Sequence, residues 1–541
     1  MESRYTMHIM PAEWRWVTVV SIGLVLLGFA PFLWVALSDT NQWQFMGALH
    51  NYQDAATYLA KMAQGEAGAW LMQFWHTPEP HEGALIQVLY LALGHLARLL
   101  SLPMIVIFHV ARVGAALFMF LSLYPLAASI WQRVRTRRIF FAIASLGAGL
   151  GWFLAPLFAT TSTLEGQIWP DLVIPEAFLL ESTVYNVHFP LTLACLVMIV
   201  AAFITAFRPG SDGDNGVGFP LPVVAILSFA LALLYPQSLV PLGGALMLFV
   251  LIAWLEGRRA YALWTARWLL AVMLPALPMA LYYVIVVNVN PAFAEWNRQN
   301  VTLAPHPLSL ILGFGLPLFL AVPAIWRSLR QFELADDRLM LLWLGAMIVC
   351  LYLPTNVQRR FLVGAMIPVA YFATRAIEDV WFRYISRRHR PYFFATLLPI
   401  ISVSQLFTIF LPVLPVVSGN PASSLGLFLE RDYALAFRWL EDQTTSDDVV
   451  LASPVVSTWM PGWAKARPVY GHPFETLDAE QKRAQVIAWY GGDDGDCMAL
   501  IETYDVRFIL VGPEEHRLGP APCLDRLSAV ATLGQVSVYA P

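Results

Sequence analysis

The sequence predicts an all-α polytopic membrane protein of about eleven transmembrane helices, followed by a small extracytoplasmic α/β domain. Hydrophobic residues make up 58% of the 541 residues, whereas charged residues make up 13%. Soluble domains carry roughly 25% charged residues, so this chain has too few charges to cover several soluble domains. The apolar residues also occur in long unbroken runs, which helical membrane spans require and β-barrel strands do not show. Composition therefore excludes a soluble globular protein, a disordered chain and a disulfide-rich secreted scaffold.

The first apolar run is predicted to be a retained span, because it is long for a signal-peptide core and lacks a small-residue cleavage site. The segment 83–101 is ambiguous, because it is apolar but contains His95 and Arg98. The eleven predicted spans are 16–37, 104–131, 139–160, 184–207, 219–235, 238–256, 267–288, 308–326, 338–354, 361–382 and 392–417.

Basic residues indicate the orientation, because cytoplasmic loops of membrane proteins carry the excess of Lys and Arg. The four basic clusters can all lie inside, together with the N-terminus, if a single span joins residue 82 to Arg133. The segment 83–101 then lies along the outer surface. The basic clusters are 133–138, 258–267, 327–338 and 383–390, and the outer segments are 38–82, 161–183, 289–307, 354–360 and everything after 417.

Two domains are predicted, a membrane domain over 1–417, with a large first outer loop at 38–82, and a soluble α/β domain over 418–541. If the second domain is extracytoplasmic, Cys497 and Cys523 can pair. Its predicted elements are helices at 430–443 and 478–490, the second capped by Asp478, and strands at 448–453, 506–512 and in the closing VSVYA segment.

The first outer loop contains a candidate catalytic carboxylate. Asp54 and Tyr58 are four residues apart, so a helix places both on one face, and the glycines Gly65 and Gly68 are expected to end that helix. A carboxylate in a partly dry cleft at the membrane surface suits a general base that accepts a proton from an attacking hydroxyl. The alternative is that Asp54 caps a helix over 55–64 through free backbone N–H groups.

Several motifs, in order along most of the chain, resemble the GT-C superfamily of integral-membrane glycosyltransferases, which includes protein O-mannosyltransferases and bacterial aminoarabinose transferases. The resemblance implies that Asp54 is the catalytic base and that the other first-loop acid, Asp39, and Tyr58 contribute to substrate binding. It is carried by Asp54, Tyr58, Gly68-Ala69-Trp70, Pro78 and Pro80, LYLALGHLARLLS, Arg112 in HVARVGAAL, QRRFLVGAMIPVAYFATRAIE at 358–378, and the C-terminal FRWLEDQTTSDDVVLAS and VYGHPFETLD.

Arg359 and Arg360 are candidates for binding a lipid phosphate. They lie in the short outer loop 354–360, against the general sidedness of basic residues. Guanidinium groups bind phosphate oxygens bidentately, which suits the phosphate of a lipid carrier at headgroup level. The resemblance favours Arg360, because it directly precedes the family's aromatic position, here Phe361. The alternative is that both side chains snorkel toward headgroups.

A third polar group begins the span at 184–207. Glu181, Tyr185 and His188 have the i, i+4, i+7 spacing of one helical stripe, which can bind a sugar or a metal or can be a polar cap on the span. Metal signals are otherwise weak: His76, Glu79, His81 and Glu82 cluster, but Pro78 and Pro80 forbid a helical zinc motif, and the Asp-rich segment 493–496 lacks calcium-loop spacing. GAGLG at 147–151 is interpreted as close helix packing.

These observations predict an inverting glycosyltransferase of the cell envelope. It would move a hexose or pentose from a polyprenyl-phosphate carrier to a hydroxyl of an acceptor glycan, lipid or protein. The predicted location is the bacterial inner membrane, with the N-terminus inside and the C-terminal domain outside. No cofactor is required, a divalent metal has no supporting motif, and no nucleic-acid partner is expected. The alternatives are a lipid or glycan transporter or flippase, and a non-catalytic membrane protein that binds a lipid or glycan.

The predicted topology can be tested by cysteine labelling with a membrane-impermeant reagent. Cysteines introduced at positions 54 and 295 should react from outside, because both lie in predicted outer loops. Cysteines at 135, 258 and 388 should react only after permeabilisation. Labelling of position 135 from outside would mean that segment 83–101 crosses the membrane, and the eleven-span arrangement would be wrong.

Overall fold

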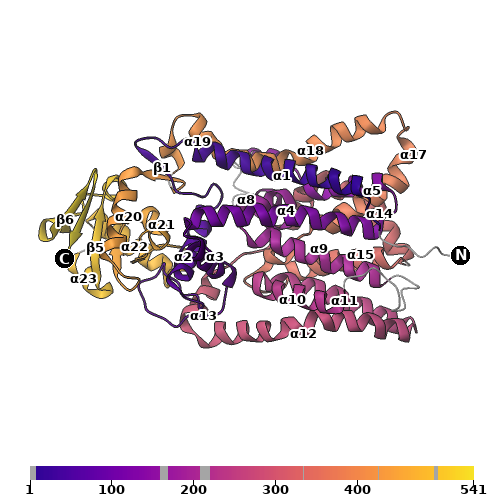
Figure 1. Ribbon diagram of the computed structural model, residues 1–541, viewed down its shortest axis with the longest axis horizontal. Helices are drawn as coiled ribbons and strands as arrows, with labels where there is room; N and C mark the ends of the chain where they lie inside the picture. The colour runs from indigo at the N-terminus through magenta and orange to yellow at the C-terminus, as the bar shows by residue number, and fades with distance from the viewer. Residues whose placement is uncertain (1–7, 159–168, 208–219, 333, 425, 493–496) are drawn as a thin grey trace. The chain divides into compact units, whose positions relative to one another are not determined.

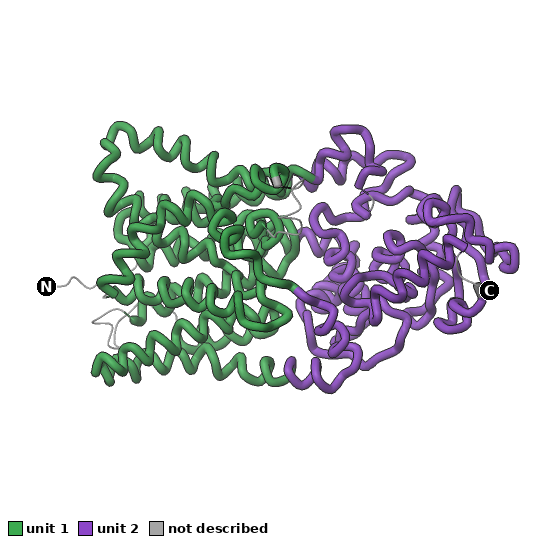
Figure 2. The backbone as a smooth tube through the Cα atoms, turned by 180° about the vertical axis from the view of Figure 1, so that it is seen from behind, with its two compact units in different colours: residues 1–29, 111–282, 302–411 green, residues 30–110, 283–301, 412–541 purple. Residues whose placement is uncertain are grey.

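The computed structural model describes residues 8–158, 169–207, 220–332, 334–424, 426–492 and 497–541, and the chain divides into two compact units (Figure 2). Unit 1 contains residues 1–29, 111–282 and 302–411. Unit 2 contains residues 30–110, 283–301 and 412–541. The predicted domain boundary at 417 stays a prediction, but unit 2 differs from the predicted soluble domain because it adds the first outer loop to the C-terminal segment.

Unit 1 is a helical membrane bundle, as predicted (Figure 1). Within the described residues, nine helices are long and apolar enough to cross a membrane. The other two predicted spans fall on shorter helices, α10 and α15. The nine candidates are Pro11–Ala36 (α1), Met104–Ile130 (α4), Val134–Leu157, His188–Ala206 (α9), Pro236–Leu255, Arg259–Val289 (α12), Pro307–Gln331 (α14), Gln358–Tyr384 and Arg390–Val417, and the shorter two are Leu221–Leu234 (α10) and Ala335–Leu351 (α15).

Burial differs between the helices of unit 1. Helix α9 and the segment Gln358–Tyr384, which contains α16 (Met366–Ala376), are largely buried and form the centre of the bundle. Helix α12, in contrast, turns a row of leucines outward, among them Leu263, Leu270, Leu274, Leu277 and Leu281. A helix surface that is apolar and unburied within the protein suits contact with lipid tails.

The predicted span 139–160 is interrupted. Helix α5 (Val134–Leu146) ends before the GAGLG segment, and α6 (Gly151–Phe158) begins at its last glycine. The interruption allows close backbone contact, because the Leu150 N–H donates to the Leu312 carbonyl at 3.0 Å, and a Cβ on Gly149 would lie 2.2 Å from that oxygen. Close packing through glycine is confirmed, although the segment separates two helices and does not lie inside one.

The first outer loop and the segment 83–101 each contribute one helix to unit 2, α2 (Tyr52–Ala67) and α3 (Val88–Leu100), and the two helices pack together (Figure 1). Glycines permit the contact: a Cβ on Gly65 would lie 2.0 Å from the Leu91 carbonyl, and one on Gly94 would lie 2.0 Å from the Met62 carbonyl. Helix α2 ends at Gly68, which has a φ of 110°. With 13 residues, α3 is about 20 Å long, too short to cross a hydrocarbon core of about 30 Å.

The first loop and the C-terminal segment share a two-stranded sheet in unit 2. Strand β1 (Trp43–Phe45) pairs antiparallel with β2 (Phe428–Glu430), with Trp43 opposite Glu430 and Phe45 opposite Phe428. More than 380 residues separate these segments in the sequence, so periodicity within either one cannot predict that they pair.

The C-terminal segment forms the predicted α/β structure. Its five-stranded mixed sheet has the order β4-β3-β5-β7-β6, with β3 parallel to β4 and β5, and β7 antiparallel to β5 and β6. Strands β3, β5 and β7 and helices α20 and α22 match the predicted elements, and β4 and β6 are additional. The bounds are Val449–Leu451 (β3), Arg467–Pro468 (β4), Val506–Val511 (β5), Ser528–Leu533 (β6), Val536–Ala540 (β7), Arg431–Gln443 (α20), Pro454–Trp463 (α21), Ala479–Gly491 (α22), Cys497–Tyr504 (α23) and Pro513–Leu518 (α24).

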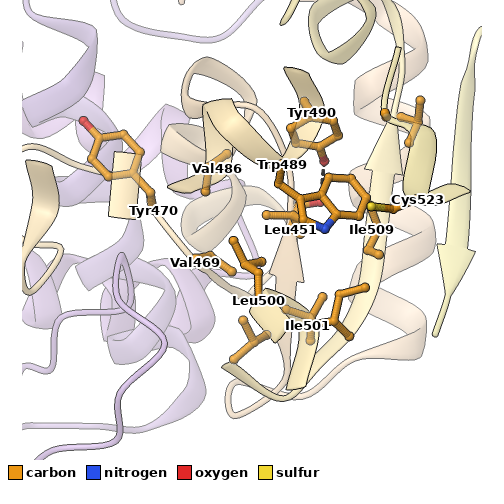
Figure 3. Packing of buried hydrophobic residues seen from close by; sticks show 14 of the residues in the cluster. Leu451, Val469, Tyr470, Val486, Trp489, Tyr490, Leu500, Ile501, Ile509 and Cys523 are labelled. Atoms are coloured by element: carbon orange, nitrogen blue, oxygen red, sulfur yellow. Dashed lines mark hydrogen bonds between the residues drawn. The ribbon is translucent and has the colours of Figure 1, made fainter. Parts of the chain in front are cut away.

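One aromatic cluster forms the core of this sheet. Trp489 and Tyr490 of α22 pack near Leu451 and Ile509 of the sheet (Figure 3). The Tyr490 hydroxyl lies 2.8 Å from the Leu510 carbonyl, so its polar end is satisfied inside the core. The predicted cap of α22 is wrong in one respect: Asp478 occupies the N-cap position, but it has a φ of 49° and its side chain makes no capping hydrogen bond.

Buried Cys523 belongs to the same aromatic cluster. The side chain of Cys497 lies outside the described residues, so the possible pairing of these two cysteines stays a prediction.

Candidate functional site

Asp54 lies in the first turn of α2. The N-cap is Asn51, whose Oδ1 accepts from the Asp54 backbone N–H at 3.3 Å and whose Nδ2 donates to Asp54 Oδ2 at 2.6 Å. The capping alternative is therefore wrong for Asp54, since Asn51 has that role. The Asp54 side chain is 45% exposed. A half-exposed carboxylate of this kind can be reached by a substrate hydroxyl.

The other two first-loop candidates are held by the protein. Tyr58 is buried, and its ring stacks on Tyr90 of α3 with centroids 4.3 Å apart. Asp39 Oδ1 accepts from the Phe45 N–H at 2.8 Å, and its Oδ2 lies 3.5 Å from the guanidinium of Arg431. Both contacts shape the loop around α2, and the predicted binding roles of Tyr58 and Asp39 stay predictions.

The segment 470–477 brings a histidine to Asp54 that sequence reasoning missed. His472 Nε2 lies 3.7 Å from Asp54 Oδ1, and the histidine side chain is 3% exposed. The next residues of the segment fold around this ring, since the N–H groups of Phe474 and Glu475 both donate to His472 Nδ1 at 3.1 Å. The C-terminal part of the chain therefore supplies a neighbour of the candidate base.

A buried ion pair lies beside this histidine. Lys61 Nζ on α2 lies 2.5 Å from Glu475 Oε1, and His76 Nδ1 lies 3.5 Å from Glu475 Oε2. Burial alone would raise the pKa of Glu475, but the charge of Lys61 holds that pKa well below its usual range. Burial lowers the pKa of His76. One sequence signal was available: Lys61 is seven residues after Asp54, on the same face of α2.

A second polar cluster lies in unit 1, where the three predicted residues of this region meet two further side chains, Glu176 and Tyr235. The Tyr235 hydroxyl donates to Glu176 Oε1 at 3.1 Å, and the His188 ring stacks on Tyr235 at 6.0 Å. Glu181 is buried and interacts with Tyr185, four residues later. These residues come from η1 (Pro175–Ala177), α8 (Leu179–Tyr185), the start of α9 and the turn before η2 (Pro236–Ser238).

The predicted helical stripe is broken between Tyr185 and His188. Helix α8 ends at Tyr185 and α9 begins at His188, because Asn186 is extended and its Oδ1 accepts from the Phe189 N–H at 2.9 Å. His188 therefore meets the others through Tyr235 and not through i, i+7 spacing. Burial, reinforced by nearby carboxylates, raises the pKa of Glu181 well above its ordinary value, which favours the neutral acid.

Two side chains hold the short helix α8. Gln405 Oε1 accepts from the Glu181 N–H at 2.9 Å, while its Nε2 donates to the Gly147 carbonyl at 2.8 Å. Arg112 Nη1 donates to the Val184 carbonyl at 2.7 Å. Helix ends have backbone groups without intrahelical partners, and these contacts satisfy one at each end.

Arg359 and Arg360 lie on the short helix η3 (Gln358–Leu362), and both are half-buried. The Arg359 N–H donates to the Thr302 carbonyl at 3.1 Å. Burial raises the pKa of Glu176, and both arginines oppose this rise, so both guanidinium groups act on one carboxylate. The unit 1 cluster therefore combines two cations with two carboxyl groups, two phenols and one imidazole.

The histidines and acidic residues of the segment 76–82 contact separate partners. Glu79 pairs with Lys482, and His81 Nε2 accepts from the Phe74 N–H at 3.0 Å, while His76 faces Glu475. In the part of the chain that the structure describes, no group of three or more His, Cys, Asp or Glu side chains can hold a metal ion. The Asp-rich segment 493–496 lies outside the described residues.

The fold is that of the GT-C glycosyltransferases. An oligosaccharyltransferase from Archaeoglobus fulgidus, tethered to an acceptor peptide, is similar over 97% of this chain and 74% of its own, with a TM-score of 0.55 and 12% identity. ArnT from Cupriavidus metallidurans, bound to undecaprenyl phosphate, is similar over 98% of both chains, with a TM-score of 0.53 and 12% identity. The mycobacterial arabinofuranosyltransferase AftD is similar over 99% of this chain and 40% of its own, with a TM-score of 0.52 and 14% identity.

No protein-family model and no curated protein matches the sequence. At 12–14% identity the structural similarity establishes the fold, and the chemistry must be argued from this chain's own residues.

Replacing Lys61 by Met should lower the free energy of unfolding by about 3–5 kcal/mol, because the Glu475 carboxylate is left charged and buried without its principal partner. The matched control is Lys465→Met. Lys465 pairs with Glu66 and Glu441 but is 35% exposed, so its loss should cost about 1 kcal/mol or less. The free energy of unfolding of both variants is measured on the purified proteins in detergent.

The stability that the Lys61–Glu475 pair contributes should decrease as pH falls. Because the folded-state pKa of Glu475 is lowered, the stabilisation is fully present above the ordinary glutamate pKa of about 4.3 and is lost as pH falls through the folded value. Equal losses for Lys61→Met and Lys465→Met at neutral pH would contradict this interpretation.

Proposed function

We propose that this chain is an inverting glycosyltransferase that moves a sugar from a polyprenyl-phosphate carrier to an acceptor hydroxyl at the extracytoplasmic face of a membrane. The observation that carries the proposal is the half-exposed carboxylate of Asp54, in the first loop after α1 of a GT-C fold. The proposed location is the bacterial inner membrane, with the N-terminus inside and the C-terminal domain outside.

The reaction follows from one displacement. The Asp54 carboxylate accepts the proton of the acceptor hydroxyl, and the hydroxyl oxygen attacks the anomeric carbon. As the new carbon–oxygen bond forms, the bond to the carrier phosphate breaks, and the lipid phosphate leaves with the electron pair. A single displacement inverts the anomeric centre. No second carboxylate is needed as a nucleophile, because the phosphate is itself a good leaving group.

The class of sugar donor follows from the location of the active site and from the charge of nucleotide sugars. Nucleotide sugars are charged and are not found outside the cytoplasm, so an outward-facing site needs a sugar tethered to lipid. The structure of ArnT bound to undecaprenyl phosphate supports a carrier of this kind, and the oligosaccharyltransferase tethered to a peptide supports a separate acceptor. Arg359 and Arg360 would hold the carrier phosphate, and Glu181, Tyr185 and His188 would contact the sugar.

The proposed function and its alternatives predict different effects of removing the charge of Asp54. A flippase or a non-catalytic lipid-binding protein has no step in which a carboxylate accepts a hydroxyl proton. Loss of the Asp54 charge would then leave its activity or its binding intact. The Asp54→Asn variant therefore separates the enzyme from both alternatives.

Asp54→Asn should lower the transfer rate by about 10²–10⁴, since this is the usual contribution of a general base. The assay is release of undecaprenyl phosphate from a panel of undecaprenyl-phosphate-linked hexoses and pentoses, with envelope extract as the acceptor source. Glu66→Gln, which removes a carboxylate at the other end of α2, is the control and should transfer normally. Wild-type turnover in Asp54→Asn would exclude the base assignment.

Arg360→Ala should weaken the binding of undecaprenyl phosphate about ten- to a hundredfold, because a hydrogen bond to a charged group is worth about 1.5–3 kcal/mol. Arg360→Lys should recover only part of this loss, since the ammonium lacks the bidentate fork. Binding is measured by titration of the purified variants in detergent. If Arg359→Ala is damaging and Arg360→Ala is silent, the choice of Arg360 is wrong, and if both are silent, the phosphate binds elsewhere.

A further inference from the structure

We infer that His472 is a positioning residue for Asp54: it is held as the neutral Nε2–H tautomer and directs that N–H group toward the Asp54 carboxylate. The inference rests on the proposed function, because it assigns Asp54 the role of base. It also gives the C-terminal segment a role in the chemistry, since the loop of residues 470–477 supplies the side chain that faces the base.

The backbone fixes the tautomer. The N–H groups of Phe474 and Glu475 both donate to His472 Nδ1 at 3.1 Å. A backbone N–H can only donate, so Nδ1 must carry a lone pair, and the ring proton must lie on Nε2. Nε2 is the atom that faces Asp54 Oδ1, at 3.7 Å.

The two Asp54 oxygens face different donors. Asn51 Nδ2 donates to Oδ2 at 2.6 Å, and His472 Nε2 faces Oδ1. A separation of 3.7 Å is too long for a hydrogen bond. Hydrogen bonds of catalytic groups are often long in enzymes without substrate and shorten in the complex. Donors on both oxygens would fix the rotation of the carboxylate and so direct a remaining lone pair toward the acceptor hydroxyl.

The loop that carries His472 is anchored to the helix that carries Asp54. Glu475 binds Lys61, which lies two turns after Asp54 on α2. Thr476 Oγ1 accepts from the N–H groups of Gly471 and His472 at 3.1 and 3.0 Å, and it donates to the His76 carbonyl at 2.6 Å. Buried contacts therefore tie the loop that carries His472 to the helix that carries Asp54.

Two substitutions separate positioning of Asp54 from support of the loop. In His472→Asn, the amide oxygen takes the place of Nδ1, so it can accept from Phe474 and Glu475, but residue 472 no longer has a donor that reaches Asp54 Oδ1. In His472→Gln, the longer amide takes the place of Nε2 and can donate to Asp54, but the loop loses its acceptor. A positioning role predicts that Gln is the better substitute for turnover and Asn the better substitute for thermal stability.

The first experiment needs no knowledge of the sugar. Histidine-selective ¹⁵N NMR of the full-length protein, with the His472 signal assigned by its loss in His472→Asn, should show the neutral Nε2–H tautomer. Asp54→Asn should shift the His472 Nε2–H resonance, whereas Glu66→Gln should leave it unchanged. A proton on Nδ1, or no response to Asp54→Asn, would overturn the inference.

The second experiment measures turnover with the undecaprenyl-phosphate-linked sugar panel. His472→Asn should lower kcat about ten- to a hundredfold, the value of one hydrogen bond to a charged group, with the KM for the lipid donor unchanged. His472→Gln should restore most of that loss. Wild-type kcat in His472→Asn, or equal losses in both variants, would overturn the positioning role. Normal turnover in Asp54→Asn would instead overturn the proposed function, so the two failures are distinguishable.

Discussion

The buried ion pair of Lys61 and Glu475 organises unit 2. Two charges removed from water are expensive, and the cost is offset only when each charge is close to its partner and further hydrogen bonds satisfy the remaining atoms. Here the pair joins α2 to the loop of residues 470–477, and His76 adds a second contact to the carboxylate. Breaking the pair would leave an uncompensated buried charge in the loop that carries His472, which faces Asp54.

In unit 1, buried polar side chains satisfy the backbone groups at the ends of short helices. The short helix α8 is too brief to satisfy its own ends, so Gln405 and Arg112 bond its backbone. Asp171 does the same for α6, where its Oδ2 accepts from the Gly151 N–H at 2.8 Å and from the Ser404 hydroxyl at 2.6 Å. Buried polar side chains thus hold short helices in place, and one of these, α8, carries the candidate binding residues Glu181 and Tyr185.

The architecture of this chain is similar to known folds although the sequences are not. At 12–14% identity the GT-C architecture persists in the chain although its sequence matches no family model. A bundle of apolar helices can exchange one aliphatic residue for another at small cost, because volume and pattern matter more than identity. A buried lysine cannot be exchanged in that way.

The sequence by itself determined the membrane class, the main spans and the C-terminal α/β elements, because these follow from apolar runs and local periodicity. It also placed Asp54 on a helix after the first span. Only the tertiary structure decided that Asn51 and not Asp54 is the cap, that α8 and α9 separate Tyr185 from His188, and that Arg359 and Arg360 act on one carboxylate. His472 could not be predicted, because its contact with Asp54 joins residues more than four hundred positions apart, and a buried charge pair between such distant segments leaves no local pattern.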